Sequence, residues 1–355
     1  MNFSRLSITR SNVNEGDGQM ALTRRTTLQA LVAGAAMVGM PAIVRSQTKL
    51  ELKCGNIMPA QHPVNLRLAE AFARISDRTH QQVQIQLFPS SQLGADDSML
   101  GQLRSGALEF FIQSGLVVSS LVPLASLNGV GFIFPDYPSV WKAMDGPVGA
   151  LIVEQFKKAN LVAFDRIWDN GFRQITSSTK PIDNPEALKG MKIRVPPSAL
   201  WTSMFESLEA SPITIPWAET YSALQTHIAD GQETPLPVIY LSKIYEVQKY
   251  LSMTNHMWDG LWFLSSNKVW DTMPKDIQTI IREEINGSAL QQRSDVARLS
   301  DDLKLKISSF GLRIIDVKPE EFRAKLQSSG FYKKWQDRFG ASNWAVLESV
   351  TGPVT

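Results

Sequence analysis

The chain has one cysteine among its 355 residues, Cys54, and only four histidines. A single cysteine excludes a disulfide within the chain, and the strand-like run LELKCGN around it favours a small buried hydrophobic residue. His62 and His256 have no histidine, cysteine or carboxylate partner at metal-ligand spacing, so the sequence predicts no zinc site there. The sequence also has no G-x-S-x-G segment and no Gly-rich phosphate loop, the motifs of α/β hydrolases and of many nucleotide-binding proteins.

Excess basic charge is absent from most of the chain. Lys and Arg number 36 and Asp and Glu 34, a formal charge of 36 − 34 = +2. Residues 1–47 alone carry five arginines against two acids, a local +3, which leaves about −1 for the remainder. A basic face for nucleic acid is therefore not expected in residues 48–355.

The N-terminal residues 1–47 have the pattern of an export leader. Adjacent Arg24 and Arg25 precede a moderately apolar stretch over residues 28–40, which is followed by small residues. This stretch is short for a membrane span and typical of a signal peptide, and the paired arginines indicate twin-arginine export. An ordinary secretory signal and an uncleaved anchor are the alternatives. We expect cleavage between residues 42 and 47, and Met20 is an alternative start.

Beyond residue 48 strand-like and helix-like patterns alternate. LELKCGN, QVQIQLF and LEFFIQSG read as strands, and PVNLRLAEAFARISDRT and DDSMLGQLRSG read as helices between them. Such a βαβαβ start predicts a mostly parallel sheet. A second series begins after residue 170 with GFRQITS, MKIRVP and SPITIP, a helix over residues 217–228, and a turn at Asp230-Gly231.

The fold class predicted is α/β, with two lobes joined by extended hinge strands. The first lobe is expected to comprise residues 48–170 plus about 257–300, and the second residues 171–256 plus about 301–355. A long helix starts near Pro274 and extends for about thirty residues, long enough to span both lobes. Gly287-Ser288 is the place where this helix could kink or divide.

Two arginines stand in short apolar segments, Arg173 in NGFRQITSSTKPI and Arg194 in LKGMKIRVPPS. Each is flanked by strand-forming residues and is expected where a strand meets a loop. A buried guanidinium needs an anion, and its planar fork matches a carboxylate. Taken alone, each arginine fits an internal salt bridge as well as a ligand.

Further motifs follow in a fixed order, SPITIPWAETYSALQTHIADGQETPLP and YEVQKYLSMTNH. With the two arginine segments they resemble the solute-binding proteins of tripartite ATP-independent periplasmic (TRAP) transporters, from about residue 50 to the late 330s. The resemblance implies a periplasmic binding-protein fold, a cleft that closes on a small organic acid, a periplasmic location, and delivery to small and large membrane subunits. It implies neither an enzyme nor a cofactor.

The resemblance also assigns candidate ligand-binding residues. Arg194, in GMKIRVP, matches the family arginine that pairs with the substrate carboxylate, and Arg173 matches the arginine of the family's NGxR motif. Trp217 matches an aromatic position that packs on the ligand, although a core tryptophan fits equally. Thr234 stands in DGQETP where the family more usually has asparagine, which changes the hydrogen bonds offered to a ligand.

The remaining candidates lie in the first lobe. Gln113 and Ser114 end the strand LEFFIQSG, and Ile57 follows the first strand, where some relatives have polar residues. These side chains favour a smaller or partly apolar organic acid. His62 is placed either at the ligand or at the start of a helix, and His256 is expected to be structural.

A cation occurs with the ligand in some family members, and Gln232 or Glu233 would then contribute. Asp96-Asp97 and Glu283-Glu284 read as solvated helix faces.

Two further functions compete with transport: an exported ligand sensor for a membrane signalling protein, and a periplasmic hydrolase or isomerase. The histidines show no triad context that would support such an enzyme.

Overall fold

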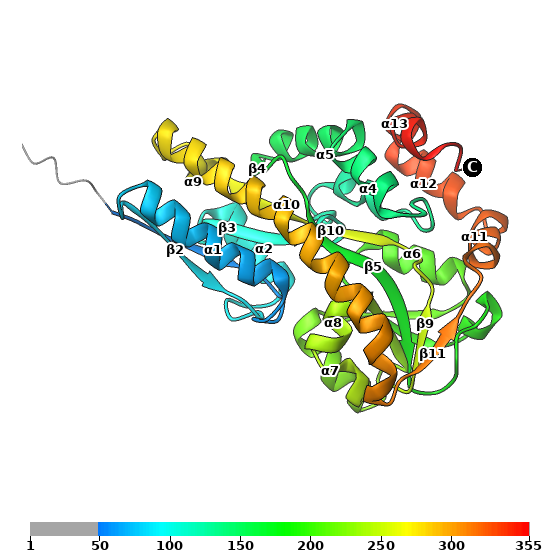
Figure 1. The fold of residues 1–355 in the computed structure, drawn as a ribbon. Coiled ribbons are helices and arrows are strands. Elements are labelled where there is room, and N and C mark those ends of the chain that lie inside the picture. The colour runs from blue at the N-terminus through cyan, green and yellow to red at the C-terminus, as the bar shows by residue number, and fades with distance from the viewer. Residues whose placement is uncertain (1–48, 355) are drawn as a thin grey trace, which may run out of the picture. The chain divides into compact units, whose positions relative to one another are not determined.

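The strands join in one mixed sheet of 11 strands within residues 49–354, the part of the chain that this computed structural model describes (Figure 1). The order along the sheet is β2-β1-β3-β10-β5-β8-β6-β7, with β4 on β10, β9 on β5 and β11 on β9. The strands are β1 (Leu50–Gly55), β2 (Val83–Phe88), β3 (Phe110–Ser114), β4 (Leu161–Ala163), β5 (Trp168–Ser177), β6 (Lys192–Val195), β7 (Ser211–Thr214), β8 (Gly231–Pro235), β9 (Tyr250–Met253), β10 (Trp258–Ser266) and β11 (Arg313–Asp316).

Helices connect most of these strands, as the alternating pattern predicts. The α-helices are α1 (Pro63–Arg78), α2 (Asp96–Ser105), α3 (Gly115–Val118), α4 (Tyr137–Met144), α5 (Pro147–Lys158), α6 (Ala199–Ser207), α7 (Trp217–Gln225), α8 (Leu236–Leu241), α9 (Asn267–Trp270), α10 (Lys275–Lys306), α11 (Pro319–Ser328), α12 (Phe331–Phe339) and α13 (Ala341–Thr351). The described residues also contain four short 3₁₀ helices: η1 (Pro123–Gly129), η2 (Pro185–Leu188), η3 (Ile244–Glu246) and η4 (Ile307–Phe310).

Two long antiparallel strands connect the two ends of the sheet. The predicted βαβαβ start is present, with β1 parallel to both β2 and β3. Strand β10 then pairs antiparallel with β3 and β5, and β5 continues past β10 to pair with β8 and β9. We call β1–β4 and β10 the first strand set and β6–β9 and β11 the second; β5 belongs to both. This arrangement is the α/β fold with extended strands linking two parts that the sequence predicts.

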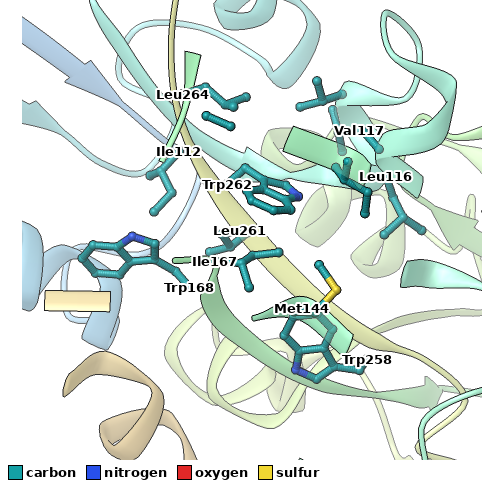
Figure 2. Packing of buried hydrophobic residues seen from close by; sticks show 14 of the residues in the cluster. Ile112, Leu116, Val117, Met144, Ile167, Trp168, Trp258, Leu261, Trp262 and Leu264 are labelled. Carbon is teal, nitrogen blue, oxygen red and sulfur yellow. The ribbon is translucent and has the colours of Figure 1, made fainter. Parts of the chain in front are cut away.

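Aromatic residues fill the core where β5 and β10 meet (Figure 2). Trp168 on β5 and Trp258 and Trp262 on β10 are at most 1% exposed. Figure 2 shows Trp262 close to Leu116 and Trp258 close to Met144. Large rings at this junction give it much of the apolar burial that stabilises the fold.

Helix α10 has 32 residues and runs past both strand sets (Figure 1). It contacts α1, which packs beside β2 of the first set, and α8, which packs beside β8 of the second set. Between these two helices it contacts β5. Arg67 and Arg74 of α1 form ion pairs with Asp295 and Glu284 of α10, each at 2.6 Å. The predicted long helix is confirmed; Pro274 caps it, and it passes Gly287 without a break.

The structure of the segment DGQETP differs from the turn predicted at Asp230-Gly231. Gly231 does not form a turn but begins β8, which lies buried between β5 and β6. A Cβ at this position would lie 2.2 Å from the carbonyl oxygen of Thr176, so glycine is needed for close strand approach. The prediction for Arg173 needs correction too, because this residue lies inside β5 rather than where a strand meets a loop. Arg194 is the last but one residue of β6, next to the loop that follows, as predicted.

The predicted leader, its twin-arginine motif and its cleavage site fall on residues 1–47 and lie outside the described residues. Among the residues that are described, no helix has the length and apolar character needed to cross a membrane. The proposed lobe boundaries stay a prediction. The C-terminal helices contact elements before and after residue 170, since α13 packs on α4 and α5 while α12 packs on α6.

Candidate ligand-binding site

A small cavity lies between the two strand sets. Its volume is about 30 Å³, and its walls come from strands, helices and loops along both sets. The structure brings seven of the eight predicted ligand-binding residues to this cavity: Ile57, Gln113, Ser114, Arg173, Arg194, Trp217 and Thr234. The eighth, His62, does not line it.

Arg194 is buried, with 1% of its surface exposed, and lines the cavity. Its Nε donates a hydrogen bond to the carbonyl oxygen of Ile215 at 2.8 Å, and it forms no ion pair with an acid among residues 49–354. Its Cζ lies 5.3 Å from the ring centroid of Trp217. Burial lowers the pKa of Arg194 to about 10, so the guanidinium stays charged at neutral pH.

Arg173 is also buried, but protein acids neutralise it. Its Nε and a terminal nitrogen donate to the two carboxylate oxygens of Glu233 at 2.5 and 2.8 Å, and another nitrogen donates to Asp259 at 2.9 Å. Burial opposes the charge, but these carboxylates outweigh it and raise the pKa of Arg173. The internal salt bridge therefore holds for Arg173, whose Cζ also lies 4.7 Å from the ring centroid of Trp201.

The polar candidates of the first strand set are partly engaged with protein groups. The Ser114 hydroxyl donates to Asp259 at 2.6 Å, and the backbone N–H of Ser114 donates to the side-chain oxygen of Gln113 at 2.8 Å. The amide nitrogen of Gln113 has no hydrogen-bond partner among the described residues. Gln113 thus has a free donor at the cavity, whereas the Ser114 hydroxyl proton is already used.

The prediction that Asp96 and Asp97 both lie on a solvated helix face is wrong for Asp96. Asp97 is exposed as expected, but Asp96 is 1% exposed and lines the cavity. No side chain of residues 49–354 donates a hydrogen bond to either of its carboxylate oxygens. Two adjacent aspartates at a helix start point in different directions, and only the packing of α2 against the cleft shows which one is buried.

Asp259, Asn170 and Trp201 also line the cavity and were not predicted. Asn170 donates to Asp259 at 2.8 Å, and the Trp201 indole nitrogen is buried without a hydrogen-bond partner among the described residues. Asn170 belongs to the NGFR segment and could have been found from that motif. Asp259 and Trp201 lie in apolar runs, WDGLWFLSS and ALWTSMFES, that read as core.

His62 and the candidate cation ligands lie elsewhere. His62 caps α1, where its Nδ1 accepts from the backbone N–H of Val64 at 3.3 Å, and burial lowers its pKa to about 3. Glu233 is held by Arg173 and by His256 Nε2 at 3.0 Å, while Gln232 donates to Thr176. The described part of the chain contains no group of three or more His, Cys, Asp or Glu residues that could hold a metal.

The chain matches the description "bacterial extracellular solute-binding protein, family 7" over residues 54–337. It belongs to this family. Members are solute-binding proteins rather than enzymes as a class.

Relatives of this family 7 protein have been characterised in several bacteria. It is 30% identical to the 2,3-diketo-L-gulonate-binding periplasmic protein YiaO of Escherichia coli, over 68% of this chain and 73% of that one. It is 28% identical to the C4-dicarboxylate-binding periplasmic protein DctP of Rhodobacter capsulatus, over 93% and 99%. A TRAP periplasmic solute-binding protein from Sulfurospirillum deleyianum with bound succinate has a TM-score of 0.80 and 29% identity, covering 86% of this chain and 99% of its own.

Proposed function

We propose that this family 7 protein captures an organic acid in the periplasm and delivers it to a TRAP-type membrane transporter, with Arg194 binding the carboxylate. The observation that carries the proposal is the contrast between the two buried arginines. Arg173 has two carboxylate partners, whereas Arg194 faces the cavity and has none within ion-pair distance among the described residues. A carboxylate ligand would complete the environment of Arg194.

The relatives support an organic acid as the solute. One is named for 2,3-diketo-L-gulonate, one for C4-dicarboxylates, and one was solved with succinate. Here Ile57, Met58, Val117 and Val238 contribute apolar walls to the cavity. These side chains favour an acid with some apolar surface.

Each remaining cavity residue has a role in this proposal. Trp217 packs against the bound acid and against Arg194. Gln113 and Thr234 offer hydrogen bonds to the rest of the ligand, and Ser114 acts through Asp259. Arg173 holds Glu233 and Asp259 in place and so orders the wall behind the ligand.

Capture requires the two strand sets to move relative to each other. Buried polar groups and charges at the cavity become strong partners for a ligand when water is excluded. Strands β5 and β10 are the hinge candidates because they link the two sets. The closed, loaded protein would then dock on the small and large membrane subunits.

Export and the membrane partner follow from the proposed role. Residues 1–47 would act as a twin-arginine signal that brings the protein to the periplasm, where the named relatives YiaO and DctP occur. Delivery to a membrane signalling protein is the second candidate function, and it uses the same cavity and the same closure. Neighbouring genes for a small and a large membrane subunit would favour transport.

The test is ligand binding by Arg194 variants. Purified protein is screened by thermal shift with succinate, lactate, pyruvate, benzoate, galactonate and 2,3-diketo-L-gulonate, since a ligand at 100 times its Kd adds about 2.7 kcal/mol to stability. The Kd of the most stabilising acid is then measured by calorimetry. Arg194→Ala is expected to weaken binding by about two orders of magnitude or more, and Arg194→Lys nearly as much because a point charge cannot form the fork.

The matched control is the other arginine. Arg173→Ala leaves Glu233 and Asp259 buried without their cation and is expected to lower the free energy of unfolding by about 3–5 kcal/mol. Arg194→Ala should lower the free energy of unfolding much less, since no acid among the described residues lies within ion-pair distance of Arg194. Undiminished binding by Arg194→Lys, or no stabilisation by any carboxylate, would count against the proposal.

A further inference from the structure

Carboxylates outnumber cations around the cavity. Among the described residues, Asp96, Asp259, Arg173 and Arg194 line it, and Glu233 lies directly behind Arg173. Three carboxylates and two guanidinium groups give a net charge of −1 when all are ionised. His256 does not balance this charge, because burial lowers its pKa and leaves the ring neutral near pH 7.

Two of the three carboxylates are well supported by hydrogen bonds. Glu233 accepts from Arg173 and contacts His256, and these partners lower its pKa although burial opposes them. Asp259 accepts from three side chains at 2.6 to 2.9 Å: Ser114, Asn170 and Arg173. These neighbours favour the ionised form of both carboxylates, although burial outweighs them at Asp259 and raises its pKa.

Asp96 lacks such support. It is as deeply buried as Asp259, but no side chain among residues 49–354 donates to it. Burial raises its pKa and neighbouring Asp97 adds to this, while the charge of Arg194 and the backbone amides of Asp96 and Trp217 act in the opposite direction. The pKa of Asp96 is above its usual value, as is that of Asp259, but Asp96 has no side-chain donor whereas Asp259 accepts from three. Asp96 is therefore the carboxylate best suited to accept a proton.

A bound carboxylate would bring a fourth negative charge into this small volume. Two guanidinium groups cannot balance four carboxylates, and an uncompensated charge in a closed cavity is costly. We propose that the cavity binds its carboxylate ligand together with one proton, which Asp96 takes up from the solvent. This inference rests on the proposed function and adds the ionisation state of the site to it.

The proton has a defined place and consequence. It bonds to one carboxylate oxygen of Asp96, and the resulting O–H group becomes a hydrogen-bond donor facing the ligand. The ligand group beside Asp96 must then be an acceptor, such as a keto oxygen or a second carboxyl oxygen. A ligand that placed a hydroxyl or ammonium donor there would leave Asp96 ionised and take up no proton.

The experiment is calorimetry of the full protein with the most stabilising acid of the carboxylate panel above. Titrations at pH 7.5 in phosphate, MOPS and Tris, whose ionisation enthalpies differ, give the number of protons taken up. We expect an uptake approaching one proton per bound ligand. Kd should also rise with pH between 6.5 and 8.5, by up to tenfold per pH unit, because the unliganded protein increasingly lacks the proton.

Two variants assign the proton to a residue. Asp96→Asn carries a neutral N–H donor at the same place, so its Kd should not depend on pH, and at pH 8.5 it should bind up to about a hundredfold more tightly than the parent protein. Asp97→Asn, an exposed neighbour on the same helix, should keep the full proton uptake. Keeping all measurements below pH 9 leaves Arg194 charged, since its pKa is about 10.

The outcomes separate this inference from the proposed function. If no carboxylate binds, the proposed function fails. If a carboxylate binds with no proton uptake, the ligand supplies its own donor and the inference is wrong. Uptake that persists in Asp96→Asn, or disappears in Asp97→Asn, also overturns the assignment. The buffer comparison on the parent protein needs no variant, so it decides the question even if Asp96→Asn does not fold.

Discussion

Arg173 and Arg194 are the same residue type in similar strand contexts, yet they have different partners. Strand β8 lies between the strands that carry them, and it presents Glu233 to Arg173 but no acid within ion-pair distance of Arg194. The flanking sequences of the two arginines are too alike to reveal this difference. At the scale of single residues, function here depends on which buried charge lacks a counter-charge.

Asp169, at the meeting point of β5, β10 and α10, is a second buried acid with an unusual pKa. It is fully buried, the indole N–H of Trp258 donates to it at 2.8 Å, and Gln292 of α10 bonds to its backbone. Burial raises the pKa of Asp169 to about 7, although the Trp258 hydrogen bond opposes the shift. At neutral pH a substantial fraction of this carboxyl is therefore protonated.

We predict that Asp169→Asn reduces the pH dependence of stability. The folded protein holds the proton up to about pH 7, whereas the unfolded chain releases it near pH 4, so this group destabilises the fold as pH rises through that window. Relative to the parent protein, Asp169→Asn should gain roughly 2–3 kcal/mol between pH 5 and pH 8. Urea unfolding at both pH values measures this gain.

Asp271→Asn is the control for that measurement, because Asp271 is exposed. It should follow the parent protein at both pH values. A constant difference between Asp169→Asn and the parent at pH 5 and pH 8 would show that the carboxyl is ionised throughout, contrary to the prediction.

At the scale of elements, α10 is the main support common to both strand sets. Its contacts with α1, β5 and α8 place it across the hinge strands, so it must accommodate any closure. Gly287 lies exposed in its interior, and a Cβ there would meet no atom within 4 Å. Glycine is costly in a helix interior because the unfolded chain is so flexible at that position.

We predict that Gly287→Ala raises the free energy of unfolding by about 0.5–1 kcal/mol. Gly311→Ala should do the opposite, because Gly311 adopts a φ of 89° that an L-residue with a Cβ disfavours, although space is also open there. Denaturant midpoints of both variants measure the effects. If both substitutions shift the midpoint in the same direction, backbone conformation is not the deciding factor.

At the scale of the whole molecule, the cavity volume implies movement. A water needs about 10–15 Å³ of such space, so a cavity of about 30 Å³ holds about two waters and no organic acid. A larger groove of about 490 Å³ lies beside it and shares Ile57 and Trp217 with it. These two side chains separate the cavity from the groove, so ligand entry requires the cleft to open.

We predict that the protein without ligand samples a more open form than the structure described here. Small-angle X-ray scattering should give a radius of gyration that decreases when a saturating carboxylate is added to the same preparation. Arg194→Ala should show no decrease at the same ligand concentration. An unchanged radius on confirmed binding would contradict closure as the capture mechanism.

Much of the fold was predictable because its elements have local signals. The amphipathic pattern of α1, the apolar strands β1 to β3 and the long helix α10 each depend on periodicity within one segment. Strand β8 was missed because its sequence, GQETP, is short and polar. It forms because β5 and β6 pair with both its edges and because Gly231 permits their close approach.

The sequence by itself determined the family, the α/β class and seven of the residues that line the cavity, because ordered motifs and local periodicity carry that information. Only the tertiary structure decided that Arg173 is neutralised while Arg194 is not, and that Asp96 is buried while Asp97 is exposed. Each of these depends on contacts between segments far apart in the chain. Charge pairing and burial are properties of such contacts, and no local pattern encodes them.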